Sequence, residues 1–175
     1  MSLYLLYNFL LYNFKTKFML SLEEMLLRFA VALAVGIIIG LEREYIGKEA
    51  GIRTSMLVSG GAALFTLAGL CLPYLIALDS QNLADIIARN SGFLGLIANI
   101  VVGIGFLGAG IIMKQNDRVH GLTTAAVIWA TAGVGILIGI GLIWFGIIAG
   151  LLISFLLYVL KGINVHTVQS EREER

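Results

Sequence analysis

The charged residues that could carry out chemistry are few, and six of them gather in one short stretch of the chain. This stretch contains three carboxylates and three cationic side chains: Glu42, Arg43, Glu44, Lys48, Glu49 and Arg53. One interpretation is a solvated loop, whose surface ion pairs contribute only about 0–1 kcal/mol each. The alternative is that Glu42 and Arg53 fold back against the protein as a buried pair. The sequence alone allows both.

Carboxylates are also the ligands that a hard cation prefers. Mg²⁺ takes octahedral oxygen ligands, usually one or two carboxylates together with several waters. Glu42, Glu44 and Asp117 are therefore the candidate metal ligands, but nothing in their spacing requires a metal site. His120 and His166 are not spaced as a pair of ligands. Because no nucleophile–base set and no phosphate-binding loop is visible, we expect no enzymatic activity and no resident cofactor, with Mg²⁺ at most a substrate or ligand.

The amino-acid composition indicates whether water or lipid surrounds most of the chain. Of its 175 residues, 59% are hydrophobic and 13% are charged, and the mean hydropathy is +0.94. A soluble domain carries roughly 45–50% apolar and about 25% charged residues. A single cysteine excludes a disulfide scaffold. A net charge of +1 without a basic block argues against a nucleic-acid partner. We therefore expect a polytopic membrane protein whose surroundings are the lipid bilayer.

Five stretches are apolar enough to cross a membrane, which takes about 20 residues. They are residues 25–41, 55–78, 93–113, 122–138 and 142–160. The sequence therefore predicts an all-α membrane protein, a five-helix bundle packed through glycine-rich faces. Arg28 is the only charge inside these spans, and it can pair with Glu24 one helical turn earlier or snorkel to the interface. The segment 139–141 is the expected tight turn between the last two helices.

The placement of lysine and arginine predicts the orientation of the helices. Most of these residues fall in the loops after the first and third spans and in the C-terminal tail, so we expect that side to be cytoplasmic and the N-terminus to lie outside. Residues 1–24 are expected to form an interfacial segment, or an untranslated leader if Met19 is the true start. Residues 25–160 form the transmembrane domain, and residues 161–175 form a short charged tail.

Glycine is abundant, and its placement predicts how the helices pack. Small residues let membrane helices approach closely, because lipid supplies no hydrophobic drive between helices. The densest cluster lies in the third span and contains Gly103, Gly105, Gly108 and Gly110. The first three match the G-x-G-x-x-G string of dinucleotide-binding folds, but that loop needs a preceding strand, whereas this string lies within an apolar span. We expect close helix packing there; the alternative is a helix break that exposes backbone to a substrate.

A few polar or amphipathic side chains fall inside the predicted spans. Thr123 and Thr124 open the fourth span, where threonine commonly caps a helix; the alternative is a small polar pocket at the cytoplasmic mouth. Asn99 lies inside the third span and is expected to hydrogen-bond to a neighbouring helix, because an unpaired amide in lipid is costly. Trp129 is expected to be an interfacial belt residue or a packing anchor.

Four motifs occur in order along the chain. In one-letter code they are GLERE at 40–44, GIRT at 51–54, GIGFLGAG at 103–110 and GLTTAA at 121–126. Together they closely resemble the MgtC/SapB family of bacterial and archaeal membrane proteins, and the resemblance covers nearly all of residues 25–160. It implies a five-span membrane domain. It also makes functional candidates of the polar residues in the first two motifs: Glu42, Arg43, Glu44, Arg53 and Thr54.

The resemblance further implies a link to magnesium homeostasis, because founding members are associated with growth in low magnesium. Many members carry an additional ACT-like cytoplasmic domain, and we expect this chain to contain the transmembrane domain alone. Two functions follow as expectations. The chain regulates other membrane proteins by docking its helices onto theirs, or it transports magnesium or another small ion as a homo-oligomer. Because no carboxylate lies in the middle of a predicted span, a pump or proton-coupled transporter is disfavoured.

Overall fold

The fold is seen in a computed structural model that describes residues 20–76, 92–115 and 118–161. Its helices are α2 (Leu22–Tyr45), α3 (Ile52–Ile76), α5 (Gly92–Ile111), α6 (Leu122–Gly139) and α7 (Ile143–Lys161). Two short strands, β1 (Met113–Gln115) and β2 (Arg118–His120), connect α5 to α6. All five of these helices are long and apolar enough to cross a membrane, which confirms the predicted five-span, all-α architecture. The expected leader up to residue 19 and the tail beyond residue 161 lie outside the described residues.

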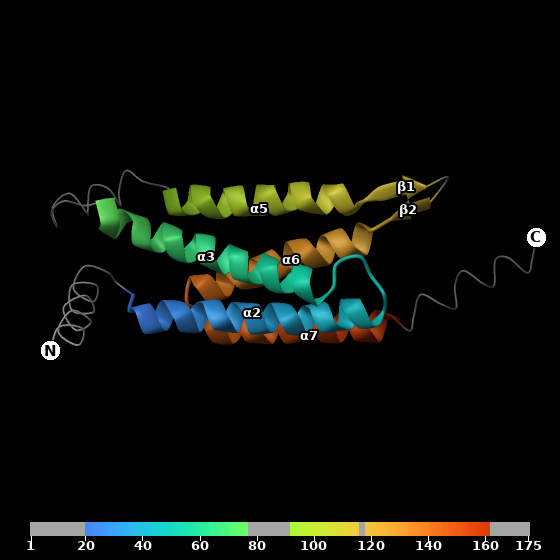
Figure 1. The fold of residues 1–175 in the computed structure, drawn as a ribbon, viewed down its shortest axis with the longest axis horizontal. Helices are drawn as coiled ribbons and strands as arrows, with labels where there is room; N and C mark the ends of the chain where they lie inside the picture. Colours follow the sequence, from blue (N-terminus) through green and yellow to red (C-terminus); the bar gives the residue numbers. More distant parts are fainter. Residues whose placement is uncertain (1–19, 77–91, 116–117, 162–175) are drawn as a thin grey trace, which may run out of the picture.

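The helices lie alongside one another in a long bundle (Figure 1). α3 and α6 form its interior, since 50% and 61% of their apolar windows are buried. The corresponding shares are 11% for α7 and only 6% for α5. Most of the surface of α5 is therefore available for contact with lipid or with another helix.

α2 extends beyond the predicted span at both ends. At its start, the Ser21 hydroxyl caps the helix by accepting a hydrogen bond from the Glu24 amide at 3.2 Å. At its other end the helix continues through the charged residues that follow the apolar stretch and ends at Tyr45. Glu42 and Arg43 therefore lie on the last turn of a helix. The rotation of that helix against its neighbours determines which of the two side chains is buried.

Several glycines lie where the central helices are in close contact. A Cβ atom on Gly36 of α2 would lie 2.6 Å from the Ser55 carbonyl oxygen of α3. A Cβ atom on Gly139 of α6 would lie 2.8 Å from the Thr66 Cβ of α3. Side chains at these positions would push the backbones apart, and dispersion contacts that hold helices together in lipid would be lost.

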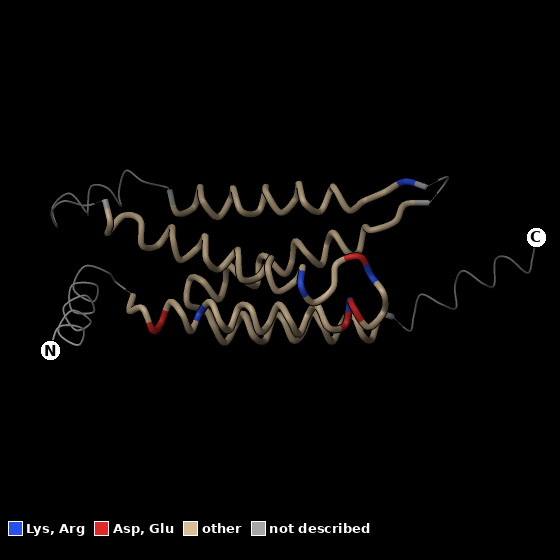
Figure 2. The backbone as a smooth tube through the Cα atoms, in the orientation of Figure 1, with Lys and Arg blue, Asp and Glu red and all other residues tan. Residues whose placement is uncertain are grey.

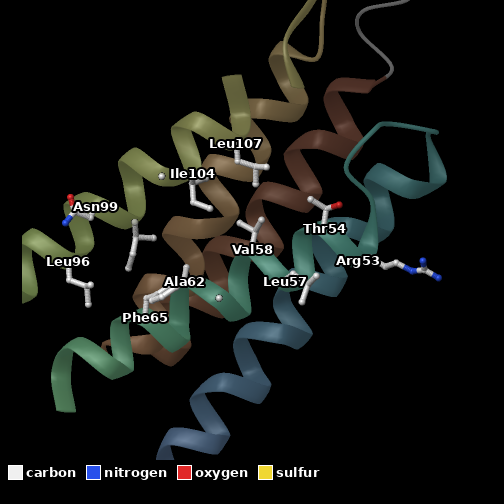
Figure 3. A pocket seen from close by; sticks show the side chains of 13 residues that line it. Arg53, Thr54, Leu57, Val58, Ala62, Phe65, Leu96, Asn99, Ile104 and Leu107 are labelled. Atoms are coloured by element: carbon white, nitrogen blue, oxygen red, sulfur yellow. The ribbon is translucent and has the colours of Figure 1, made fainter. Parts of the chain in front are cut away.

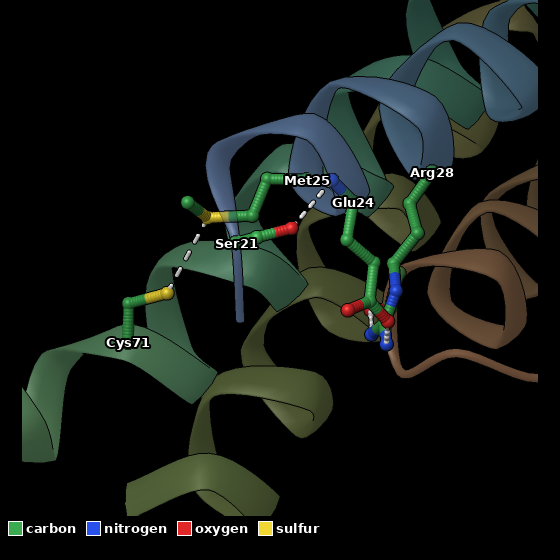
Figure 4. A network of polar contacts seen from close by, with 6 residues as sticks. Ser21, Glu24, Met25, Arg28 and Cys71 are labelled. Atoms are coloured by element: carbon green, nitrogen blue, oxygen red, sulfur yellow. Dashed lines mark hydrogen bonds and ion pairs between the residues drawn. The ribbon is translucent and has the colours of Figure 1, made fainter. Parts of the chain in front are cut away.

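The turn between α6 and α7 is held by an arginine from α2. Gly141 adopts a φ of +103°, as the expected turn at 139–141 requires. The buried Arg28 guanidinium packs against Gly141 and donates a hydrogen bond from Nη1 to the Gly139 carbonyl at 2.9 Å. Arg28 also pairs with Glu24, as predicted from their spacing (Figure 4). It therefore ties α2 to the end of α6, and its side chain is directed into the protein rather than to the interface.

A short β-hairpin follows α5 and is absent from the sequence prediction, which extended the third span to residue 113. α5 instead ends at Ile111, and Lys114 of β1 pairs with Val119 of β2. Gly121, with a φ of +85°, packs against the Ile111 carbonyl and turns the chain into α6. Three-residue strands with both polar and apolar side chains carry too little periodicity to be detected in a sequence.

The middle parts of the helices carry few charged residues, and most charged residues in the described part of the chain lie towards the two ends of the bundle (Figure 2). Glu24 and Arg28 lie at one end. The other end, which we name the hairpin end, carries the α2–α3 loop and the β1–β2 hairpin (Figure 1). The sequence predicts that this end is cytoplasmic.

Candidate functional site

A cluster of polar side chains joins α2, the α2–α3 loop and α6 at the hairpin end. We name it the polar cluster: Glu42, Arg43, Glu49 and Thr124. Arg43 is 3% exposed, and its Nη2 donates a hydrogen bond to Thr124 Oγ1 at 3.0 Å. Thr124 Oγ1 in turn donates to Glu49 Oε2 at 3.1 Å. One hydroxyl therefore connects a buried cation on α2 to a carboxylate in the loop.

Glu42 lies beside Arg43 and is largely enclosed. Its side chain is 10% exposed, and its Oε2 lies 3.7 Å from Arg43 Nη1. Neither carboxylate oxygen has a hydrogen bond to any described residue. A buried carboxylate with a single loose ion pair is poorly compensated for the loss of water.

The structure does not bring Glu42 and Arg53 together, so the pair suggested by the sequence is not formed. Arg53 is exposed in the first turn of α3, and the buried cation beside Glu42 is Arg43. The sequence contained a signal for this arrangement. Positions 28, 32, 35, 39 and 43 recur at helical spacing, and all five are buried on one face of α2. Extending that face by one more turn would have identified Arg43.

The loop carboxylates have local contacts of their own. Glu44 Oε2 accepts a hydrogen bond from the Ile52 amide at 2.9 Å and so caps the start of α3. Glu49 lies in the loop outside the membrane-spanning helices. A backbone hydrogen bond, followed by the Thr124 hydroxyl, holds the pKa of the Glu49 carboxyl below its ordinary value of 4.5. The solvated-loop interpretation therefore holds for the exposure of Glu44 and Glu49, which nevertheless make these specific bonds, but it fails for Glu42 and Arg43, whose side chains are largely enclosed.

The candidate metal ligands are not gathered into a site within the described ranges, where no group of three or more His, Cys, Asp or Glu side chains could hold a metal ion. Glu44 uses one oxygen to cap α3, and Glu42 lies beside Arg43. Asp117 falls outside the described residues. Metal binding by these three carboxylates stays a prediction.

The two threonines at the start of α6 have different surroundings, and neither caps the helix. The N-cap is Gly121, which makes no side-chain capping bond. Thr123 is exposed, whereas Thr124 is 2% exposed and belongs to the polar cluster. The capping interpretation is therefore wrong, because the chain enters α6 through a left-handed glycine that leaves both threonines inside the helix. Trp129 is 54% exposed on the outer face of α6.

α5 presents an open face that combines glycines with one amide. No heavy atom lies within 4 Å of a Cβ built on Gly103, Gly105 or Gly110. Gly108 alone among the four faces a neighbour, since its Cβ would lie 3.4 Å from the Ala125 Cβ of α6. α5 runs without a break from Gly92 to Ile111, so the alternative of a broken helix is wrong.

Asn99 lies in the middle of α5 and is exposed. The expected hydrogen bond to a neighbouring helix is absent, since its amide has no hydrogen bond to any residue in the described part of the chain. Beside it, a groove of about 630 Å³ separates α5 from α3 (Figure 3). Asn99 and Gly103 line the groove from α5, and Thr54 and Arg53 line its end near the α2–α3 loop.

The chain is similar to a known family and to several of its named members. The model of the MgtC family matches residues 29–166. The chain is 40% identical over 116 residues to "Protein MgtC" of Salmonella typhimurium strain LT2, which covers 66% of this chain and 43% of that protein. It is 35% identical over 139 residues to the "Putative magnesium transporter YhiD" of Escherichia coli K12, covering 78% of this chain and 60% of that protein.

An uncharacterized protein of Haemophilus influenzae is 39% identical over 124 residues, which is 70% of this chain and 50% of that protein. The chain thus spans about half the length of the curated relatives it matches. No solved structure matches it.

Proposed function

Because the chain belongs to the MgtC family and its five apolar helices fit a lipid bilayer, we propose that it regulates another membrane protein by helix–helix contact in the cell membrane. The magnesium named for one relative supports a role within magnesium homeostasis. The observation that carries the proposal is the open face of α5, whose apolar window is only 6% buried although the helix carries Asn99 and three open glycines.

The physical chemistry of helix association in lipid favours this face as a contact surface. At about 3.6 residues per turn, Gly110 lies about 20° from Asn99 around α5, so it allows the backbone of a second helix to approach closely on the side that carries the amide. Gly103 lines the groove toward α3, and Gly105 lies about 120° from Asn99. The Asn99 amide, exposed in the middle of a spanning helix, would gain a hydrogen-bond partner from that helix, worth about 0.6–2 kcal/mol. A docked helix therefore satisfies both features at once.

Co-purification from mild detergent tests the proposal, with Gly110→Leu as the informative variant. Gly110 has open space at its Cβ and shares the side of α5 that carries Asn99, so we expect leucine there to obstruct a docked partner without a clash inside the protein. Gly133→Leu is the matched control, because Gly133 also has open space but lies on α6. Gly108→Leu is unsuitable, since it would disturb the contact with Ala125 inside the protein.

We expect Gly110→Leu to lose the co-purifying membrane protein and Gly133→Leu to retain it. Retention of the same partner by a folded Gly110→Leu variant would contradict docking through α5.

The second candidate function is transport of magnesium or another small ion. Glu42 favours it, because its nearly enclosed carboxylate has no hydrogen bond within the described residues and lines a groove of about 510 Å³ at the hairpin end. Transport requires flux through purified protein in liposomes that contain a magnesium-sensitive dye. A flux above that of empty liposomes, altered by Glu42→Gln, would favour transport over regulation. The absence of flux from a folded sample would leave regulation as the supported function.

A further inference from the structure

The groove between α3 and α5 has the size and lining of a site for an apolar ligand. Its volume of about 630 Å³ lies within the roughly 300–1,000 Å³ of small-molecule sites. Leu57 and Phe65 line it from α3, and Leu96 and Ile104 line it from α5 (Figure 3). It runs between two helices long enough to span the membrane, so lipid hydrocarbon is the material that surrounds it.

One end of this groove carries a cationic side chain that is not bonded to any other described residue. Arg53 is exposed and has no hydrogen bond or ion pair with any residue in the described ranges. Arg28 and Arg43 differ in being buried and bonded. Arg53 lies in the first turn of α3, whose start is capped by the Glu44 carboxylate, so the guanidinium of Arg53 itself is the cation available at this end of the groove. Its side chain extends away from the apolar lining (Figure 3).

We propose that this groove binds an anionic phospholipid, with an acyl chain between α3 and α5 and the phosphodiester at Arg53. Apart from Thr54 and Asn99, the walls are apolar and match hydrocarbon, and Arg53 at the end of the groove matches a negative headgroup. Both parts of one phospholipid molecule are therefore complemented. Charge selects the lipid, because a headgroup with a net negative charge gains from Arg53, whereas a zwitterionic headgroup carries its own cation. The inference goes beyond the proposed function, since it assigns a lipid ligand to the groove on the α3 side of α5, with Asn99 at the boundary between that groove and the side proposed for docking.

Lipid retention by the purified protein tests this inference. The full chain in mild detergent is titrated with dioleoylphosphatidylglycerol or with dioleoylphosphatidylcholine, and bound lipid is counted by native mass spectrometry. We expect preferential retention of phosphatidylglycerol. Arg53→Gln should lower its affinity about fivefold, which corresponds to about 1 kcal/mol for one cation at an anionic lipid surface.

A second variant addresses the apolar part of the site. Gly61 lines the groove and has no heavy atom within 4 Å of its Cβ, so Gly61→Leu fills the groove from α3. It should lower the retention of phosphatidylglycerol although Arg53 is intact. If Gly61→Leu fails to fold, Leu57→Asn makes the wall polar at a side chain that is 65% exposed, and the same loss is expected.

The matched control for charge is Lys114→Gln, because Lys114 is an exposed cation on β1 that does not line the groove. It should retain the affinity of the unmodified chain. Equal retention of both lipids by the unmodified chain would overturn the inference. An effect of Lys114→Gln as large as that of Arg53→Gln would also overturn it, and so would unchanged retention in folded Gly61→Leu or Leu57→Asn.

Discussion

Replacement of Thr124 by valine isolates the contribution of the polar cluster to stability. Valine keeps the branched shape but removes the oxygen that accepts from Arg43 and donates to Glu49. Arg43 is 3% exposed, and its Nε already lacks a partner within the described residues, so water does not replace the lost acceptor. A hydrogen bond to a buried charged group contributes about 1.5–3 kcal/mol. The variant should therefore lose about 1.5–3 kcal/mol of stability.

At roughly 2–4 °C per kcal/mol for a chain of this size, the melting temperature should fall by about 3–12 °C. Thermal unfolding of the purified protein in one detergent, followed by helical circular dichroism, measures this shift. Thr123→Val is the control, because Thr123 is the adjacent residue but is exposed and has no bond to a described residue. Equal melting temperatures for the two variants would show that the buried Arg43–Thr124 bond does not stabilise the protein.

Three further predictions concern the same scaffold. Gly135→Leu should prevent folding, because even a Cβ at this position would collide with the Ser59 carbonyl of α3, whereas Gly133→Leu should fold; the yield of monodisperse protein in detergent measures the difference. Gly141→Ala should lower the melting temperature, since φ is +103° and the new Cβ would lie 2.9 Å from Arg28 Nη2; Gly95→Ala is the control, because its Cβ meets open space. Glu49 has a pKa below 4.5, so its stabilising contribution is fully present above that pH and is lost as the pH falls through the lower value; Glu49→Gln should remove this acid-dependent loss from melting curves recorded between neutral and acidic pH.

The number and approximate limits of the spanning helices could be predicted because hydrocarbon solvent imposes one rule along the whole chain. In lipid, where no water is available, a run of about 20 apolar residues satisfies its backbone hydrogen bonds by forming a helix. The turn at 139–141 followed from the same rule, since the apolar run there is too long for one helix. The Glu24–Arg28 pair followed from spacing within a single helix.

The contacts of the candidate site were harder to predict because they join distant parts of the chain. The Arg43–Thr124 bond spans 81 positions, and its existence depends on how α2 is rotated against α6. The prediction for Asn99 was wrong because the sequence places an amide within an apolar span without showing which side of that helix faces its neighbours. Gly105 and Gly108 belong to the same glycine-rich motif, and the sequence does not distinguish them. In the structure, only Gly108 of the two faces α6.

The most direct test of regulation through α5 is site-specific photocrosslinking in intact membranes. A photoreactive residue at Phe106, which is 84% exposed on α5, reports on the open face, and one at Phe155, 63% exposed on α7, serves as the matched position. The account predicts an adduct with a different membrane protein from position 106 but not from 155, lost when Gly110→Leu is added. Adducts that form equally at both positions, or that contain only further copies of this chain, would contradict it.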